Sequence, residues 1–441
     1  MKNQHTLPVA IIGGGPIGLA AAAHLTLKEE PFILFEAGSS IGSNILEWGH
    51  VRMFSTWKYN LDKASRRLLE KTGWVAPNES SLPTGKDLVE KYLLPLSTIT
   101  ELKKNILLHA KVEGIAKKGL NKLKTVKREN SPFEIYVDVK GEQKVFEAKA
   151  VIDATGTWQS PNPSLSNGIW TKKEQELIEQ IHYGIPDIVQ EEDRYKNKTI
   201  MVVGSGHSAI NSILYLAQLK KQFPQTKLYW VLRKQKVDEA YGGLETDELE
   251  ARGELGKKMK KLVETNQLTV LTPFSIRELK KEGEKISVSG EWNSKEVVLH
   301  DIDELIVNTG FRPDRTFLDE IRIELDPAVE SVKSLAPLID PNIHSCGTVR
   351  PHGEQELRHP EKNFYIVGMK SYGRAPTFLL ATGYEQVRSI VDYLTGDLES
   401  AKKIFLDLPK TGVCSSGIES TLKSTGCEID VINQKNNSCC K

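Results

Sequence analysis

Apolar and polar positions near the start of the chain predict a strand, a tight turn, a helix and a second strand. Val9–Ile12 is apolar throughout, three glycines follow it, and residues 16–23 are small or apolar. A second apolar run, Phe32–Phe35, ends in Glu36. Short runs without polar interruption are typical of strands buried on both faces of a parallel sheet. The pattern therefore predicts a βαβ unit at the start of the chain.

The same pattern returns in the middle of the chain. Residues 200–203, after Thr199, are apolar, a turn that contains two glycines follows, and residues 210–220 have helical periodicity. Residues 228–232 form the next apolar run. A second βαβ unit is therefore predicted here.

Other segments complete these two units. Residues 105–150 and 262–298 alternate between apolar and polar positions, which predicts antiparallel strands and, over 105–150, a small meander. Further apolar strands are predicted at residues 151–156, 305–310 and 363–368, before a long helix over 379–394. The predicted fold is α/β, with two Rossmann-like dinucleotide-binding domains, the second inserted into the first. The predicted boundaries are 1–195 and 311–409 for the first domain, 196–310 for the second, and 410–441 for a flexible tail that contains cysteines.

Glycines in the first turn have the spacing of a dinucleotide-binding loop, Gly13-x-Gly15-x-x-Gly18. That spacing permits a tight turn, a close approach of the backbone to a pyrophosphate, and close packing of helix on strand. The N–H groups at the start of the helix can then bind phosphate. Glu36 is placed to accept hydrogen bonds from ribose hydroxyls. A glycine turn without a nucleotide is the alternative, which the complete βαβ context disfavours.

The second unit ends differently from the first. Its second strand is followed by Arg233 and Lys234 instead of an acid. An acid accepts from a free 2′-hydroxyl, whereas Arg and Lys suit a 2′-phosphate. We therefore expect NADPH at the second loop and a cofactor without that phosphate at the first. The alternative for Arg233 and Lys234 is an ordinary exposed strand end.

Composition and charge narrow the classes of function. The 441 residues predict two to three domains. With 59 Lys and Arg against 58 Asp and Glu, the chain has no global field to attract nucleic acid or an anionic membrane. Residues 3–27 are uncharged, but their prolines and glycines argue against a membrane helix. Five cysteines do not form a secreted disulfide framework, so we expect a cytoplasmic protein acting on small molecules.

The two units together resemble the two-dinucleotide-binding-domain flavoproteins. The first glycine loop with Glu36 looks like their FAD site, and residues 153–156 and 308–314 look like their two crossings between domains. The chain is most similar to the class B flavin monooxygenases, which use NADPH and O₂ to form a flavin C4a-hydroperoxide. Residues 347–371 are similar to a subgroup associated with arsenic resistance.

Three departures from these flavoproteins stand out. The monooxygenase signature F-x-G-x-x-x-H is absent, and His182-Tyr183-Gly184 stands in its region. The cysteine pair of the disulfide reductases is also absent, which disfavours a thioredoxin-reductase mechanism. The usual Gly-Asp after the last strand is Gly368-Met369, so a contact to the ribityl chain must come from another residue.

The resemblance and the long connection over residues 38–62 supply the candidate site residues. Trp48, Phe54 and Trp57 are expected to wall the flavin ring. Arg52 and Arg374 are candidates to stabilise an anionic reduced flavin or peroxide, and Asn60 to donate a hydrogen bond near O₂; surface or turn-capping roles are equally open. The candidates for cofactor binding are Gly13, Gly15, Pro16, Gly18, Glu36, Gly42, Trp48, Phe54, Thr155, Gly156, Gly204, Ser205, Gly206, His207, Ser208, Arg233, Lys234, Gly310 and Gly368.

The expected function is an FAD-dependent NADPH oxidoreductase, in particular a monooxygenase that oxidises a small soft heteroatom: sulfur, or trivalent arsenic or antimony. The thiols that could capture such a metalloid are Cys346, Cys427, Cys439 and Cys440. Two alternatives stay open: a thiol-linked metalloid or disulfide oxidoreductase, and a non-catalytic flavin-binding sensor. A complete NADPH site disfavours the sensor, because a sensor needs no source of hydride.

Overall fold

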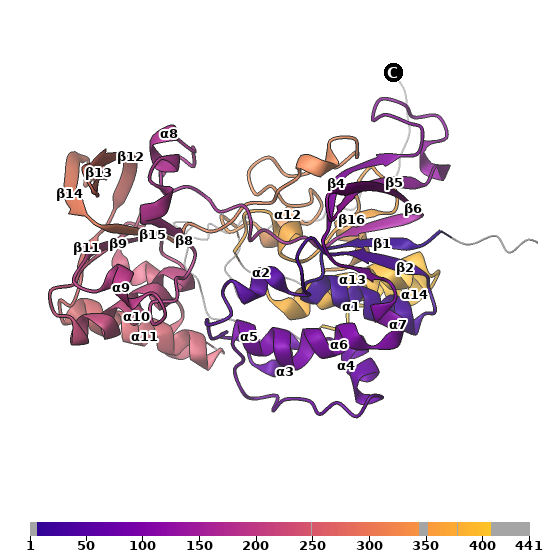
Figure 1. Ribbon diagram of the computed structural model, residues 1–441, viewed down its shortest axis with the longest axis horizontal. Helices are drawn as coiled ribbons and strands as arrows, with labels where there is room; N and C mark the ends of the chain where they lie inside the picture. Colours follow the sequence, from indigo (N-terminus) through magenta and orange to yellow (C-terminus); the bar gives the residue numbers. More distant parts are fainter. Residues whose placement is uncertain (1–6, 248, 344–351, 377, 407–441) are drawn as a thin grey trace, which may run out of the picture.

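The computed structural model describes residues 7–247, 249–343, 352–376 and 378–406, and this part of the chain contains two five-stranded parallel sheets. The first sheet has the order β16-β7-β1-β2-β3 and the second the order β11-β10-β9-β15-β8. Figure 1 shows the two sheets side by side along the long axis of the molecule. The strands of the first sheet are β1 (Val9–Ile12), β2 (Phe32–Phe35), β3 (Ile106–Leu107), β7 (Ala150–Asp153) and β16 (Phe364–Ile366). Those of the second are β8 (Ile181–Tyr183), β9 (Thr199–Val203), β10 (Lys227–Val231), β11 (Thr269–Leu271) and β15 (Glu304–Val307).

The chain leaves the first sheet, builds the second, and then returns. Strand β16 follows the whole second sheet in sequence and pairs in parallel with β7. This confirms the predicted α/β class with one nucleotide-binding unit inserted in the other. Strand β8 lies before residue 196 and yet pairs with β15 of the second sheet. The second sheet therefore gains its outer strand from a segment that the sequence pattern had assigned to the first domain.

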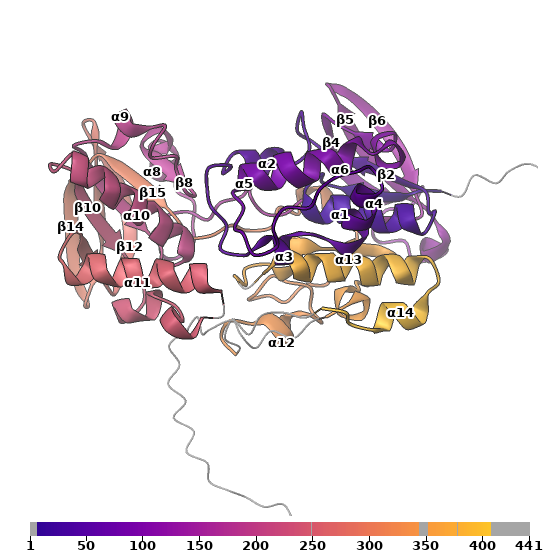
Figure 2. The same ribbon diagram turned by 90° about the horizontal axis from the view of Figure 1, so that it is seen from below.

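Helices cover the faces of both sheets. Helix α1 (Pro16–Leu27) is buried through residues 20–23, so its alanines let it lie close against α13 (Leu380–Leu394) and α4 (Lys63–Glu70). Figure 2 shows α1, α4 and α13 together on one unit and α10 (His207–Gln222) with α11 (Glu250–Glu264) on the other. The shorter helices are α2 (Ser43–Leu46), α3 (Trp57–Asn60), α5 (Gly85–Leu88), α6 (Leu94–Thr98), α7 (Thr100–Lys103), α8 (Lys172–Gln175), α9 (Glu192–Tyr195), α12 (Ala336–Ile339) and α14 (Leu398–Lys402). Among the described helices, none has the length and apolar character that crossing a membrane requires.

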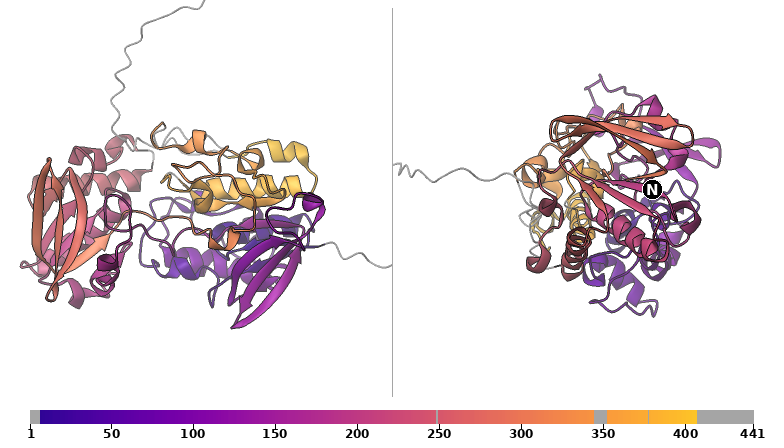
Figure 3. Two further views of the ribbon diagram at one scale, coloured as in Figure 1. Left: turned by 90° about the horizontal axis from the view of Figure 1, so that it is seen from above. Right: turned by 90° about the vertical axis from the view of Figure 1, so that its left-hand side faces the viewer.

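Two antiparallel sheets of three strands complete the fold, and Figure 3 shows them toward opposite ends of the molecule. One consists of β4 (Ala110–Lys117), β5 (Phe133–Val139) and β6 (Glu142–Ala148), which confirms the predicted meander. The other consists of β12 (Phe274–Glu282), β13 (Lys285–Trp292) and β14 (Lys295–Ile302).

Lys117, at the end of β4, is buried, although it begins a lysine-rich segment that continues to Lys127. Its side chain is only 2% exposed. Its ammonium nitrogen donates to the Ser131 carbonyl at 3.0 Å and lies 3.5 Å from the centre of the Phe133 ring. Burial lowers the pKa of Lys117 to about 8. The apolar stem and the ring contact place this lysine in the meander, while the following lysines, Lys118, Lys122, Lys124 and Lys127, are exposed.

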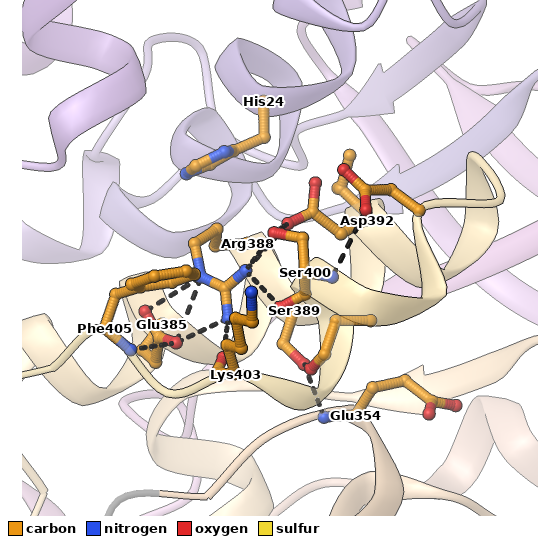
Figure 4. Close-up of polar contacts among 12 residues, drawn as sticks. His24, Glu354, Glu385, Arg388, Ser389, Asp392, Ser400, Lys403 and Phe405 are labelled. Atoms are coloured by element: carbon orange, nitrogen blue, oxygen red, sulfur yellow. Dashed lines mark hydrogen bonds and ion pairs between the residues drawn. The ribbon is translucent and has the colours of Figure 1, made fainter.

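Helix α13 also anchors the last described residues, as the close-up in Figure 4 shows. Arg388 forms ion pairs with Glu385 and Asp392 on the same helix, at 2.6 and 2.7 Å. Its guanidinium lies 4.6 Å from the centre of the Phe405 ring, and the Phe405 N–H donates to Glu385. This network therefore holds residues 400–405 against the helix that packs on α1.

Candidate functional site

At the end of β1 the chain turns into α1 around an open space. Gly13 has φ = +101°, and a Cβ there would lie 2.7 Å from the Ala154 carbonyl oxygen. A Cβ on Gly18 would overlap the Gly13 carbonyl oxygen. Gly15, which precedes α1, has no described atom within 4 Å of an added Cβ, and no described side chain caps the helix. The unpaired N–H groups at the start of α1 are therefore available to an anionic group.

Glu36 stands beside this turn, at the end of β2. One carboxylate oxygen accepts from the Gly14 N–H at 2.6 Å, and the other accepts from the Gly38 N–H at 2.7 Å and the Ser43 hydroxyl at 3.0 Å. Gly42, also expected at this site, has φ = +70° and precedes α2. The carboxylate thus holds the first turn and the following loop together, and its further lone pairs can accept from a ribose.

The start of α10 repeats the glycine turn and uncapped helix found at the start of α1. Gly204 has φ = +130°, and a Cβ there would overlap the Asn308 carbonyl oxygen. Gly206 has no described atom within 4 Å of an added Cβ, and α10 begins at His207 without a described side-chain cap. Ala154 follows β7 and Asn308 follows β15, so the residues after the two crossing strands support the two glycine turns in the same way.

The end of β16 is tied to the end of β7 by a buried ion pair. The Lys370 ammonium lies 2.7 Å from Asp153, with both side chains 0% exposed, and it donates to the Thr155 hydroxyl at 2.9 Å. The Gly368 N–H is used by Gln386 of α13. Lys370 was not among the residues expected from the sequence, although it lies two residues after Gly368, and Asp153 lies two residues before Thr155. The other expected crossing glycines, Gly156 and Gly310, both have positive φ, +69° and +88°.

Three aromatic side chains, which we call the aromatic junction, lie where the two units meet. Trp158 stacks on Phe311 with ring centres 4.8 Å apart and lies 6.3 Å from Trp48. Its indole N–H donates to Glu47 at 2.6 Å. Of the three, only Trp48 was expected to wall the site. Trp158 and Phe311 follow the two crossing segments, so their position depends on how those segments meet.

The remaining aromatic candidates, Phe54 and Trp57, lie in different surroundings in the structure. Phe54 packs against His207, at 5.5 Å between ring centres, and so bridges the loop after α2 to the second unit. Trp57 is 3% exposed and belongs to the core of the first unit, which places it within the interior instead of on a wall.

The polar candidates Asn60, Arg52 and Arg374 differ in burial. Asn60 is 0% exposed, its amide N–H donates to the Ser55 carbonyl at 2.8 Å, and its oxygen accepts from the Ser55 hydroxyl. It therefore holds the loop in shape. The side chains of Arg52 and Arg374 are exposed. Their part in flavin chemistry stays a prediction.

In the second unit, one basic side chain, Arg233, is exposed, and two histidines, His207 and His182, have lowered pKa values. Arg233 is exposed at the end of β10 and donates to the Ser166 carbonyl at 3.0 Å. Burial lowers the pKa of His207 to about 4, and the positive charge of Arg252 adds to this. Burial, with Arg194 and His50, likewise lowers the pKa of His182 to about 4. These histidines are therefore neutral at neutral pH.

The candidate thiols are not among the residues that the structure describes. All five cysteines, at positions 346, 414, 427, 439 and 440, lie outside the described residues. Residues 1–345 contain no cysteine, so the described turns and the aromatic junction have no thiol among them.

Two parallel sheets, each with an uncapped helix after a glycine turn and one inserted in the other, define a two-dinucleotide-binding-domain flavoprotein. The chain belongs to the pyridine nucleotide-disulphide oxidoreductase family, which matches residues 10–346. It is an oxidoreductase that uses FAD and NADP(H).

Similar proteins differ in the reactions that they are named for. The chain is 25% identical over 341 residues to a ferredoxin–NADP reductase of Lactobacillus johnsonii, covering 77% of this chain and 85% of that protein. Its fold is similar to the bacillithiol disulfide reductase Bdr (YpdA) of Bacillus cereus, with TM-score 0.64, 16% identity, and 89% and 100% of the two chains covered. It is also similar to the FAD-bound cadaverine monooxygenase DfoA of Erwinia amylovora, with TM-score 0.62, 12% identity, and 92% and 99% covered.

Proposed function

We propose that FAD binds at the start of α1, that NADPH binds at the start of α10, and that the chain oxygenates a small soft heteroatom substrate. The N–H groups of Gly15 and Ile17, at the start of α1, would hold the FAD pyrophosphate, and Glu36 the adenosine ribose. Arg233 and Lys234 would hold the 2′-phosphate of NADPH. The open space beside Gly15 and Gly206 supports this fit, because a Cβ at either position would project into it.

Bound FAD would supply the redox chemistry that no side chain can provide. For a thioether, R₂S + O₂ + NADPH + H⁺ gives R₂SO + H₂O + NADP⁺: one oxygen atom joins the sulfur lone pair, and the other leaves as water with the electrons of NADPH. A soft lone pair needs no general base. The chain's contribution is to position both cofactors and to exclude water, for which the aromatic junction is suited.

The observation that carries this proposal is that the described residues of the aromatic junction are rings and include no thiol. Trp158 lies between Phe311 and Trp48, and residues 1–345 lack cysteine. The choice of trivalent arsenic and antimony beside sulfur rests on the resemblance of residues 347–371 and on the cysteine-containing tail. Like the domain boundaries at 195, 310 and 409, that choice stays a proposal.

A second candidate is a reductase that passes electrons from NADPH to another acceptor. It is favoured by the 25% identity to a ferredoxin–NADP reductase and by the fold likeness to a bacillithiol disulfide reductase. Such a reaction consumes no oxygen, so the two candidates differ in a measurable way.

The experiment is to follow NADPH oxidation by the FAD-loaded protein under air and under argon, with peroxide quantified. We expect antimonite, a trivalent arsenical or a simple thioether to raise the rate under air only, with oxygenated product formed. A rate that persists under argon with a ferredoxin or a disulfide as acceptor would support the second candidate. Truncation after Pro409 and Cys346→Ser then decide whether the thiols take part: a stimulation that survives both removes them from the reaction.

A further inference from the structure

We infer that Arg252 binds the diphosphate of the nicotinamide cofactor, beside the start of α10. This inference rests on the proposed binding of NADPH there. It adds a ligand that lies on α11, outside both the glycine turn and the Arg233–Lys234 pair.

Arg252 belongs to a cluster that also contains Phe54 and His207. The His207 ring, on the first residue of α10, lies 5.5 Å from the Phe54 ring. The Arg252 guanidinium carbon lies 5.9 Å from the centre of the same ring. Gly206, immediately before His207, faces open space. Arg252 and the first residue of α10 therefore contact the same ring, and the positive charge of Arg252 acts on His207 at the helix terminus where the diphosphate is expected.

Close packing of α11 explains why an arginine is buried here. A Cβ on Gly253 or Gly256 would overlap the carbonyl oxygens of Leu244 and Tyr241, so α11 lies directly against the preceding turns. This approach brings Asp247 to Arg252. The two side chains are 1% and 7% exposed and form two hydrogen bonds, of 2.6 and 2.8 Å.

The Asp247–Arg252 pair holds a planar donor group in a fixed orientation. Arginine presents paired N–H donors that match phosphate as well as carboxylate. His207 does not supply the positive charge, because burial and the charge of Arg252 lower its pKa to about 4. We therefore expect the diphosphate to compete with Asp247 for the Arg252 guanidinium.

Arg252 and Arg233 then have separable effects. The diphosphate is common to NADPH and NADH, whereas the 2′-phosphate belongs to NADPH alone. Arg252 should set the affinity for both nucleotides equally, and Arg233 should set the preference between them.

The experiment measures the dissociation constants of NADP⁺ and NAD⁺ for the FAD-loaded protein by calorimetry. Arg252→Ala should weaken both by about tenfold or more, with the ratio between them unchanged, and Arg252→Lys should recover part of the loss. Asp247→Asn keeps an oxygen for the Leu249 N–H, which Asp247 accepts at 3.0 Å, and removes the competing charge. It should tighten both nucleotides. Arg277→Ala, at an exposed arginine paired with Glu291, is the matched control and should change neither.

Three results would overturn the inference. One is an unchanged affinity in Arg252→Ala, and another is a loss confined to NADP⁺. The third is weaker binding in Asp247→Asn with a lower melting temperature, which would show that the pair is purely structural; this variant and Arg252→Lys keep the test decisive if Arg252→Ala does not fold. Failure of the wild-type protein to bind either nucleotide would overturn the proposed function as well.

Discussion

Individual glycines of one motif have different physical roles in this protein. Gly18 is required by the fold, because a Cβ there would overlap the Gly13 carbonyl oxygen. Gly15 is not constrained by any described atom within 4 Å of an added Cβ. The sequence motif contains both glycines and does not distinguish them. Only the structure shows that Gly18 is required for packing, whereas Gly15 faces the space proposed for the ligand.

Gly15→Ala should therefore fold and yet lose most of its FAD. The added methyl group would project into the space that the pyrophosphate is proposed to occupy, and it strains no described contact. The measurement is the flavin absorbance of the purified variant, together with its circular dichroism. Gly18→Ala is the contrast: it should fail to accumulate as folded protein. Full FAD occupancy in Gly15→Ala would show that the cofactor lies elsewhere.

At the scale of elements, the ends of β2 and β10 carry opposite charges. Glu36 is held by two backbone N–H groups and a hydroxyl, which fixes an acceptor beside α1. Arg233 is exposed and held through the Ser166 carbonyl, which lies in the segment between the two sheets. In the proposed function, the equivalent position in each unit would therefore hold a different ribose.

Arg233→Ala should lower kcat/KM for NADPH by about tenfold or more, because a hydrogen bond to a charged group contributes about 1.5–3 kcal/mol. The efficiency with NADH should barely change, so NADH serves as the internal control. Steady-state kinetics with both nucleotides provides the test. Equal losses with NADPH and NADH would mean that Arg233 holds the fold and not the 2′-phosphate.

At the scale of the whole molecule, three histidines link stability to pH: His359 is buried, and His182 and His207 are half-buried. Burial lowers the pKa of His182, His207 and His359 from 6.5 to about 4. The unfolded chain therefore takes up protons at these residues before the folded protein does. Their contribution to stability is complete above pH 6.5 and is lost as the pH falls toward 4.

We expect the free energy of unfolding to fall between pH 6.5 and 4 by about 1.4 kcal/mol per pH unit for each histidine. Urea unfolding of the protein at pH 7, 6 and 5 measures this slope. Replacing His359, whose ring accepts the Glu324 N–H, with Gln should make the slope shallower. A stability that is constant across this range would mean that these histidines titrate normally in the folded protein.

The amino-acid sequence by itself determined the fold class and the position of the two glycine turns. Uninterrupted apolar runs such as Val9–Ile12, and glycines at fixed spacing, encode strands and turns through local chemistry, so a pattern is enough to find them. The alternation of residues 105–150 likewise predicted the meander, except that Ile106–Leu107 joins the first parallel sheet as β3.

Only the tertiary structure decided which side chains meet. Trp158 and Phe311, Lys370 and Asp153, and Phe54 and Arg252 are each brought together by segments far apart in sequence. The same packing took Asn60 into the interior, although its loop had placed it among the site candidates. Contacts between distant segments depend on how the two sheets and their crossings pack, which no local pattern encodes.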